Sequence, residues 1–99
     1  MEFCMIRAND LQAYVRENDA ILVDLRCKED YQEYHIRGAI HIPAEQLSEF
    51  MKHTDKNRTH IFYCRHGSLS IQEGKKYTRL GYRICSLAGG MDAFVRMKT

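Results

Sequence analysis

Short apolar segments that alternate with helix-like segments are the feature that most constrains this fold. Residues 21–25, Ile-Leu-Val-Asp-Leu, form a compact apolar run that is typical of a strand buried on both faces. Residues 60–63 form a second such run. Before the first run, apolar residues follow helical spacing, as at Leu11, Tyr14 and Val15. This alternation predicts an α/β fold with a mainly parallel central sheet and helices on both faces.

The chain has 99 residues, which is the length of one domain, so we expect a single domain over residues 1–99. About five short strands are expected, at residues 3–6, 21–25, 39–42, 60–63 and 83–87. Helices are expected from about residue 11, at residues 28–34, 44–52 and 70–80, and after Gly89-Gly90.

Charge and hydropathy argue against nucleic-acid and membrane partners. The net charge of +2 is small, and the basic cluster of Lys75, Lys76, Arg79 and Arg83 contains no interleaved aromatic residues, so we interpret it as a solvated helix face and its exit. The segment from Met1 to Arg7 lacks the pattern of a signal peptide, and no aliphatic run is long enough to span a bilayer. We therefore expect a cytoplasmic protein.

The four cysteines, Cys4, Cys27, Cys64 and Cys85, are scattered and include no CxxC pair. A structural metal site would normally show at least one close pair of ligands, so we predict neither a metal site nor a cofactor. In a protein without a secretion signal we expect reduced thiols. Cys4 and Cys85 are interpreted as small buried hydrophobic residues in strands.

The strongest candidate for chemistry is the segment 64–70, Cys-Arg-His-Gly-Ser-Leu-Ser, between a strand and a helix. Ligands bind beyond the carboxyl ends of parallel strands. Small residues let the backbone N–H groups of such a loop point inward, the helix directs its positive end there, and Arg65 adds a charge. Each effect favours the thiolate of Cys64, which is the nucleophilic form. The pattern alone leaves open that Cys64 merely ends a buried strand.

Residues 63–70 resemble the active-site loop of rhodanese-like domains. Other segments resemble further motifs of that family, in the same order along the chain. They are residues 23–26 (an Asp-x-Arg strand end), 35–43 (His-Ile-x-Gly-Ala-x-x-Ile-Pro), 80–82 (Leu-Gly-Tyr) and 87–94 (which contains the Gly-Gly turn). Together the five matches cover nearly the whole chain, and their order makes the resemblance specific.

The resemblance implies a single-domain sulfurtransferase. A donor such as thiosulfate would leave its sulfane sulfur on Cys64 as a persulfide, and a small thiol or a protein would accept it. Cys64 is then the nucleophile, and backbone N–H groups with Arg65 hold the donor. The implied substrate-binding residues are Arg65, His66, Gly67, Ser68, Leu69 and Ser70. Asp24 and Arg26 are expected to support the site, as a binding pair or, as we favour, as a structural ion pair.

The loop departs from the family at Leu69, where a basic residue is common, so Arg65 is its only permanent charge and we expect a weaker preference for thiosulfate.

Three other functions stay open. A thiolate phosphatase or arsenate reductase is disfavoured, because a phosphatase needs an arginine where this chain has Ser70. The others are a catalytically silent interaction module and a slow enzyme that hands persulfide to a partner protein. Cys27 lies near the same sheet edge, but we do not expect it to bond with Cys64 or to accept its sulfur.

Overall fold

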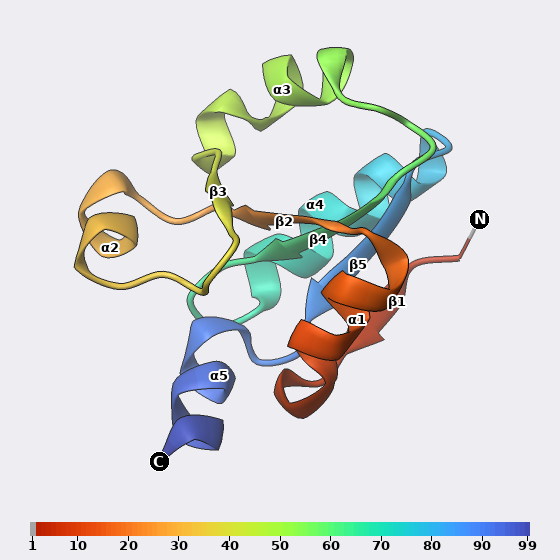
Figure 1. The fold of residues 1–99 in the computed structure, drawn as a ribbon. Coiled ribbons are helices and arrows are strands. Elements are labelled where there is room, and N and C mark those ends of the chain that lie inside the picture. The colour runs from red at the N-terminus through yellow and green to blue at the C-terminus, as the bar shows by residue number, and fades with distance from the viewer. Residues whose placement is uncertain (1) are drawn as a thin grey trace.

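Five strands form one parallel sheet in the order β1-β5-β4-β2-β3 in a computed structural model that describes residues 2–99 (Figure 1). Met1, which begins the N-terminal segment considered above, lies outside the described residues. The strands are β1 (Cys4–Ile6), β2 (Ile21–Asp24), β3 (Ile40–His41), β4 (Thr59–Tyr63) and β5 (Arg83–Leu87). The helices are α1 (Leu11–Asn18), α2 (Lys28–Glu33), α3 (Leu47–His53), α4 (Ser68–Arg79) and α5 (Gly90–Lys98). Short 3₁₀ helices, η1 (Ala8–Asp10) and η2 (Ala44–Gln46), precede α1 and α3.

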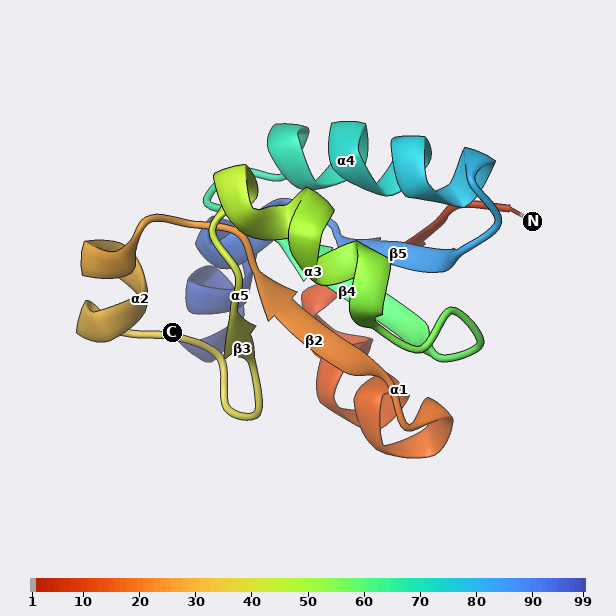
Figure 2. The ribbon, with the colours of Figure 1, turned by 90° about the horizontal axis from the view of Figure 1, so that it is seen from above.

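Helices cover both faces of the sheet, which confirms the predicted α/β architecture. Successive strand residues point to opposite faces, so a fully apolar strand supplies two cores. Ile61 of β4 belongs to the core under α1 and α5, together with Leu11 and Phe94. Phe62, the next residue, belongs to the core under α3 and α4, together with Tyr77. Figure 2 shows α4 and α1 on opposite sides of the sheet.

The helix after β4 begins at Ser68, two residues earlier than the predicted start. Gly67, the residue before it, has a backbone φ of 110°, a left-handed conformation that glycine adopts without strain. This turn lets the chain enter the helix at once. Ser68 and Leu69 therefore occupy the first turn of α4 and are not loop residues.

The basic cluster lies on solvent-facing positions of α4 and at the start of β5, which agrees with its interpretation as a solvated face. Lys75, Lys76, Arg79 and Arg83 are all exposed. α4, with 12 residues, is the longest helix of the described chain. Among residues 2–99, no helix combines the length and the apolar character that a membrane crossing requires.

The expectation of reduced thiols at Cys4 and Cys85 was wrong, because these two residues form a disulfide. β1 pairs with β5, and their register places Cys4 directly opposite Cys85, with the Cα atoms 4.4 Å apart. The two cysteines are 81 residues apart in the chain, so no local pattern indicates that they meet. Both do lie in strands, as expected, and Cys85 is buried.

The strand order places the carboxyl ends of β2 and β4 side by side, and the connections that leave these two strands run toward opposite edges of the sheet. After β2 the chain continues to β3 on one side, and after β4 it continues to β5 on the other. The pairing extends one residue past β2, since the Leu25 N–H donates to the carbonyl of Tyr63, the last residue of β4, at 2.9 Å. In open α/β sheets, ligands bind in the crevice at such a switch point.

Candidate active site

Cys64 is the first residue after β4, and its side chain is surrounded by hydrogen-bond donors. Its Sγ accepts the backbone N–H groups of Gly67 at 3.2 Å and Ser70 at 3.4 Å. The thiol also donates to the Ser70 hydroxyl at 3.6 Å. Hydrogen bonds to a charged acceptor are stronger than those to a neutral one, and the two amides are placed where a negatively charged sulfur could accept both.

The N-terminus of α5 fixes the loop in this conformation. The N–H groups of Met91 and Asp92 donate to the carbonyls of Cys64 at 2.9 Å and Arg65 at 3.0 Å. Gly90 allows this approach, because a Cβ atom there would lie 2.5 Å from the Cys64 carbonyl oxygen. The motif at residues 87–94 thus contributes to the site, because its N–H groups bind the Cys64 and Arg65 carbonyls and so point them toward α5.

The first turn of α4 adds positive potential at the same place. The first N–H groups of a helix have no partner within it, so those of Ser68 and Leu69 can donate hydrogen bonds to an anion. The positive end of the helix dipole also attracts an anion there. Arg65 is exposed and takes part in no ion pair within the described chain. His66, by contrast, is paired with Asp92, whose carboxylate offsets any charge on the imidazole.

Ser86 is a residue of this site that the sequence analysis missed. Its hydroxyl lies 2.6 Å from the hydroxyl of Ser70, which donates to the Gly67 carbonyl at 3.0 Å. Ser70 and Ser86 are both fully buried. A serine within the apolar strand at residues 83–87 was the available signal, because a buried hydroxyl needs a partner.

Asp24 and Arg26 form a buried ion pair behind the loop. The Arg26 guanidinium lies 2.8 Å from the Asp24 carboxylate, which also accepts hydrogen bonds from the Arg26 backbone N–H at 2.9 Å and the Tyr63 hydroxyl at 2.6 Å. Burial, and then the hydrogen bond to Asp24, raise the pKa of Tyr63 well above its ordinary value, so the phenol keeps its proton. Burial alone would lower the pKa of Arg26, but the hydrogen bond and charge of Asp24 raise it. The charge of Arg26 is therefore largely compensated.

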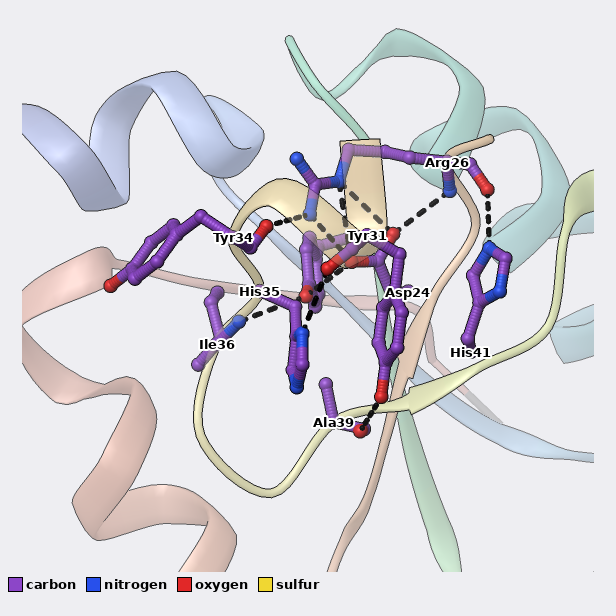
Figure 3. Close-up of polar contacts among 9 residues, drawn as sticks. Asp24, Arg26, Tyr31, Tyr34, His35, Ile36, Ala39 and His41 are labelled. Carbon is purple, nitrogen blue, oxygen red and sulfur yellow. Dashed lines mark hydrogen bonds and ion pairs between the residues drawn. The ribbon is translucent and has the colours of Figure 1, made fainter. Parts of the chain in front are cut away.

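The same arginine anchors the segment that contains α2 (Figure 3). Arg26 donates to the Tyr34 carbonyl at 2.7 Å, and its own carbonyl lies 2.8 Å from Nε2 of His41. The ring of Tyr31 is stacked on His35 and His41, with centroid distances of 3.8 and 4.6 Å. Both histidines thus pack against the ring of Tyr31. Within residues 2–99, no group of three or more potential metal ligands is found.

A cavity of about 470 Å³ opens at the switch point and contains most of the predicted site residues. Three apolar residues, Leu25, Ala44 and Leu69, form part of its wall. The other lining residues are Arg26, Cys27, Asp30, Glu45, Cys64, Arg65, His66 and Ser68. Gly67, Ser70 and Asp24 are buried and do not line it. The structure therefore brings the free thiols of Cys64 and Cys27, the cation of Arg65 and a partly apolar wall into a single cavity.

Comparisons with known proteins show what this chain is similar to. The chain is 30% identical over 81 residues to thiosulfate sulfurtransferase GlpE of Coxiella burnetii, a match that covers 81% of this chain and 76% of that protein. It is 28% identical over 79 residues to a tRNA sulfurtransferase of Pyrobaculum aerophilum, which covers 80% of this chain but only 16% of the relative.

The fold matches a crystal structure of a rhodanese-related protein from Thermoplasma volcanium, with a TM-score of 0.85 at 23% identity. This match covers 95% of the present chain and 92% of the other. A family model described as rhodanese-like domain matches residues 7–97. The chain therefore belongs to the rhodanese-like domain family, which confirms the resemblance drawn from its motifs.

Proposed function

We propose that this chain is a sulfurtransferase that carries sulfane sulfur on Cys64. The observation that carries the proposal is the pair of N–H groups, from Gly67 and Ser70, that face the Cys64 sulfur at 3.2 and 3.4 Å. The same donors suit a persulfide anion as well as a thiolate, because both present a negatively charged sulfur to the loop. The family to which the chain belongs supports this class of reaction.

In the first step the Cys64 thiolate attacks the outer sulfur of a donor such as thiosulfate. A new S–S bond forms to Cys64 while the S–S bond of thiosulfate breaks, and sulfite leaves with the electron pair. Arg65 and the free N–H groups of Ser68 and Leu69 are the groups we assign to binding the donor anion. No oxidant or reductant is consumed.

In the second step a thiophilic acceptor attacks the outer sulfur of the persulfide and the Cys64 thiolate is regenerated. Cyanide would leave as thiocyanate, and a thiol would leave as a persulfide. The deprotonated Cys64 is again the species that the loop amides stabilise, so it is a good leaving group.

The cavity wall bears on the choice of donor. Leu69 and Ala44 supply no charge, and Asp30 and Glu45 place carboxylates at the same cavity. A divalent anion gains less from Arg65 alone than it would from two cations. We therefore propose thiosulfate as a usable donor but a weakly bound one.

A persulfide assay tests this function directly. The protein is incubated with thiosulfate, its intact mass is measured, and the added sulfur is mapped by alkylation and peptide analysis. We expect one added sulfur atom on Cys64, none in Cys64→Ser, and thiocyanate release on addition of cyanide. No sulfur on Cys64 from thiosulfate or from an organic persulfide would instead favour the interaction module.

The phosphatase alternative gains no support from the site. A clamping arginine would have to stand where Ser70 is, and the Ser70 hydroxyl is buried and already bonded to the Gly67 carbonyl. We expect no hydrolysis of an aryl phosphate by the same preparation.

A further inference from the structure

We propose that Cys27 is a second sulfur carrier, which takes the outer sulfur from the Cys64 persulfide and presents it to acceptors too large to reach Cys64. The inference rests on the proposed function, because it needs a persulfide on Cys64. It assigns to Cys27 a role that the sequence analysis did not favour, and it does so on the shape of the site.

The two residues share a cavity. Cys27 and Cys64 are the two cysteines of the described chain that are not in the disulfide, and both line the cavity of about 470 Å³. They come from the ends of adjacent strands, since Cys27 follows β2 and Cys64 follows β4. The pairing of Leu25 with Tyr63 holds these two strand ends together.

Cys27 also faces a second cavity, of about 500 Å³, whose wall includes Tyr31, His41 and Gln46. Glu45 lines both cavities as well. Cys27 therefore stands at the boundary between the cavity that contains Cys64 and a neighbouring one that does not.

The two thiols differ in how far solvent can reach them. Cys64 is 6% exposed, whereas Cys27 is exposed. A small acceptor such as cyanide can enter the cavity to reach Cys64. A peptide or protein thiol brings a backbone with it, and the exposed Cys27 is the sulfur that such a molecule can approach.

The segment around Cys27 is held in place by contacts on both sides of the residue. Cys27 is the N-cap of α2, and its carbonyl accepts the Tyr31 N–H at 3.1 Å. On its other side, Arg26 is anchored to Asp24 and to the carbonyl of Tyr34 (Figure 3). A fixed position at the cavity wall keeps the second thiol at a high effective concentration.

The transfer balances without any further reactant. The Cys27 thiolate attacks the outer sulfur of the Cys64 persulfide, an S–S bond to Cys27 forms, and the bond between that sulfur and Cys64 breaks. The electron pair returns to the Cys64 sulfur, which again accepts hydrogen bonds from the N–H groups of Gly67 and Ser70. Because the outer sulfur lies one S–S bond of about 2 Å beyond Cys64, the two residues need not approach as closely as a disulfide demands.

The experiment follows one turnover. Protein loaded with a single equivalent of sulfur is quenched with an alkylating agent over time and digested so that Cys27 and Cys64 lie on different peptides. We expect the sulfur to appear first on Cys64 and then on Cys27, with a first-order rate that does not depend on protein concentration. Sulfur that stays on Cys64 alone, or a rate that rises with protein concentration, would overturn the relay.

Two variants separate this inference from the proposed function. Cys64→Ser should load neither cysteine, and loading of Cys27 in it would show that Cys27 acts independently. Cys27→Ser should still load Cys64 and release thiocyanate with cyanide at the wild-type rate, but transfer to glutathione, a tripeptide thiol, should fall about tenfold. Equal transfer to glutathione by Cys27→Ser and wild type would refute the relay and leave the proposed function intact, whereas failure of Cys64 to load would refute the function itself.

Discussion

The hydroxyl of Ser86 lies 2.6 Å from that of Ser70, deep in the protein behind the sulfur of Cys64. Ser70 contacts Cys64 through both its N–H group and its hydroxyl, so Ser86 fixes a residue that bonds twice to the sulfur. Ser86 is fully buried, so we assign it as a positioning residue of the proposed reaction.

We predict that Ser86→Ala lowers kcat for thiocyanate formation severalfold and leaves the KM for thiosulfate nearly unchanged, since the residues that bind the donor are not altered. Loss of one buried hydrogen bond should reduce stability by only about 1 kcal/mol. The rate at which iodoacetamide alkylates Cys64 gives a second readout, which should also fall. Ser48→Ala, at an exposed serine of α3, is the matched control. If both variants keep wild-type kinetics, Ser86 has no positioning role.

Gly90→Ala is predicted to damage both folding and activity. The backbone φ of 61° is strained for alanine, and the new Cβ would meet the Cys64 and Arg65 carbonyl oxygens at 2.5 and 2.7 Å. Gly38→Ala separates these effects, because Gly38 has a φ of 88° but open space around a Cβ. We expect about 1–2 kcal/mol of destabilisation at Gly38, from the backbone alone, and a larger loss at Gly90. Urea unfolding measures the stability of each variant, and the persulfide assay measures its activity. Equal losses in Gly90→Ala and Gly38→Ala would contradict a role for the close approach of Gly90 to the loop carbonyls.

Leu69→Arg is predicted to lower the KM for thiosulfate. The substitution adds a second cation to the cavity wall, in the first turn of α4 and near Arg65. Two cations hold a divalent donor better than one, and the effect should shrink as ionic strength rises. Leu80→Arg adds the same charge at an exposed residue after α4 and should leave KM unchanged. An unchanged KM in Leu69→Arg would mean that loop charge does not determine donor preference.

The sheet and its helices could be predicted because their signals are local. The run at residues 21–25 must lie between two apolar layers wherever it occurs, and a glycine such as Gly81, with a φ of 94°, marks a helix end by itself. The start of α4 was placed late because the sequence does not show that Gly67 adopts a left-handed conformation. Local patterns thus predicted which elements form but not every boundary.

Contacts between distant segments could not be predicted in the same way. The disulfide depends on the register of β1 against β5, and the Ser70–Ser86 contact on how α4 packs on β5. The shared cavity of Cys27 and Cys64 likewise depends on β2 and β4 being neighbours. Each of these requires the strand order, which alternation of strands and helices alone does not determine.

His60 is predicted to make folding stability decrease at acidic pH. This residue of β4 is fully buried, with Nε2 2.8 Å from the Thr54 hydroxyl and Nδ1 2.9 Å from the Arg58 carbonyl. Burial lowers the pKa of His60 below its ordinary value of 6.5. The hydrogen bond to the Arg58 carbonyl opposes this shift, as does the charge of Asp55, while the charge of Arg58 adds to it.

The direction of the pH effect follows from where the proton binds. As the pH falls below about 6.5, the unfolded chain binds a proton at His60 more readily than the folded protein does, so the unfolded state is favoured. His60→Gln replaces the ring with a side chain that can donate and accept but does not titrate. We expect the urea midpoint of the wild type to fall more between pH 7.5 and pH 5.5 than that of His60→Gln. His53→Gln is the control, because His53 is exposed and paired with Glu49. Parallel loss of stability in wild type and His60→Gln would show that the buried imidazole does not govern the acid response.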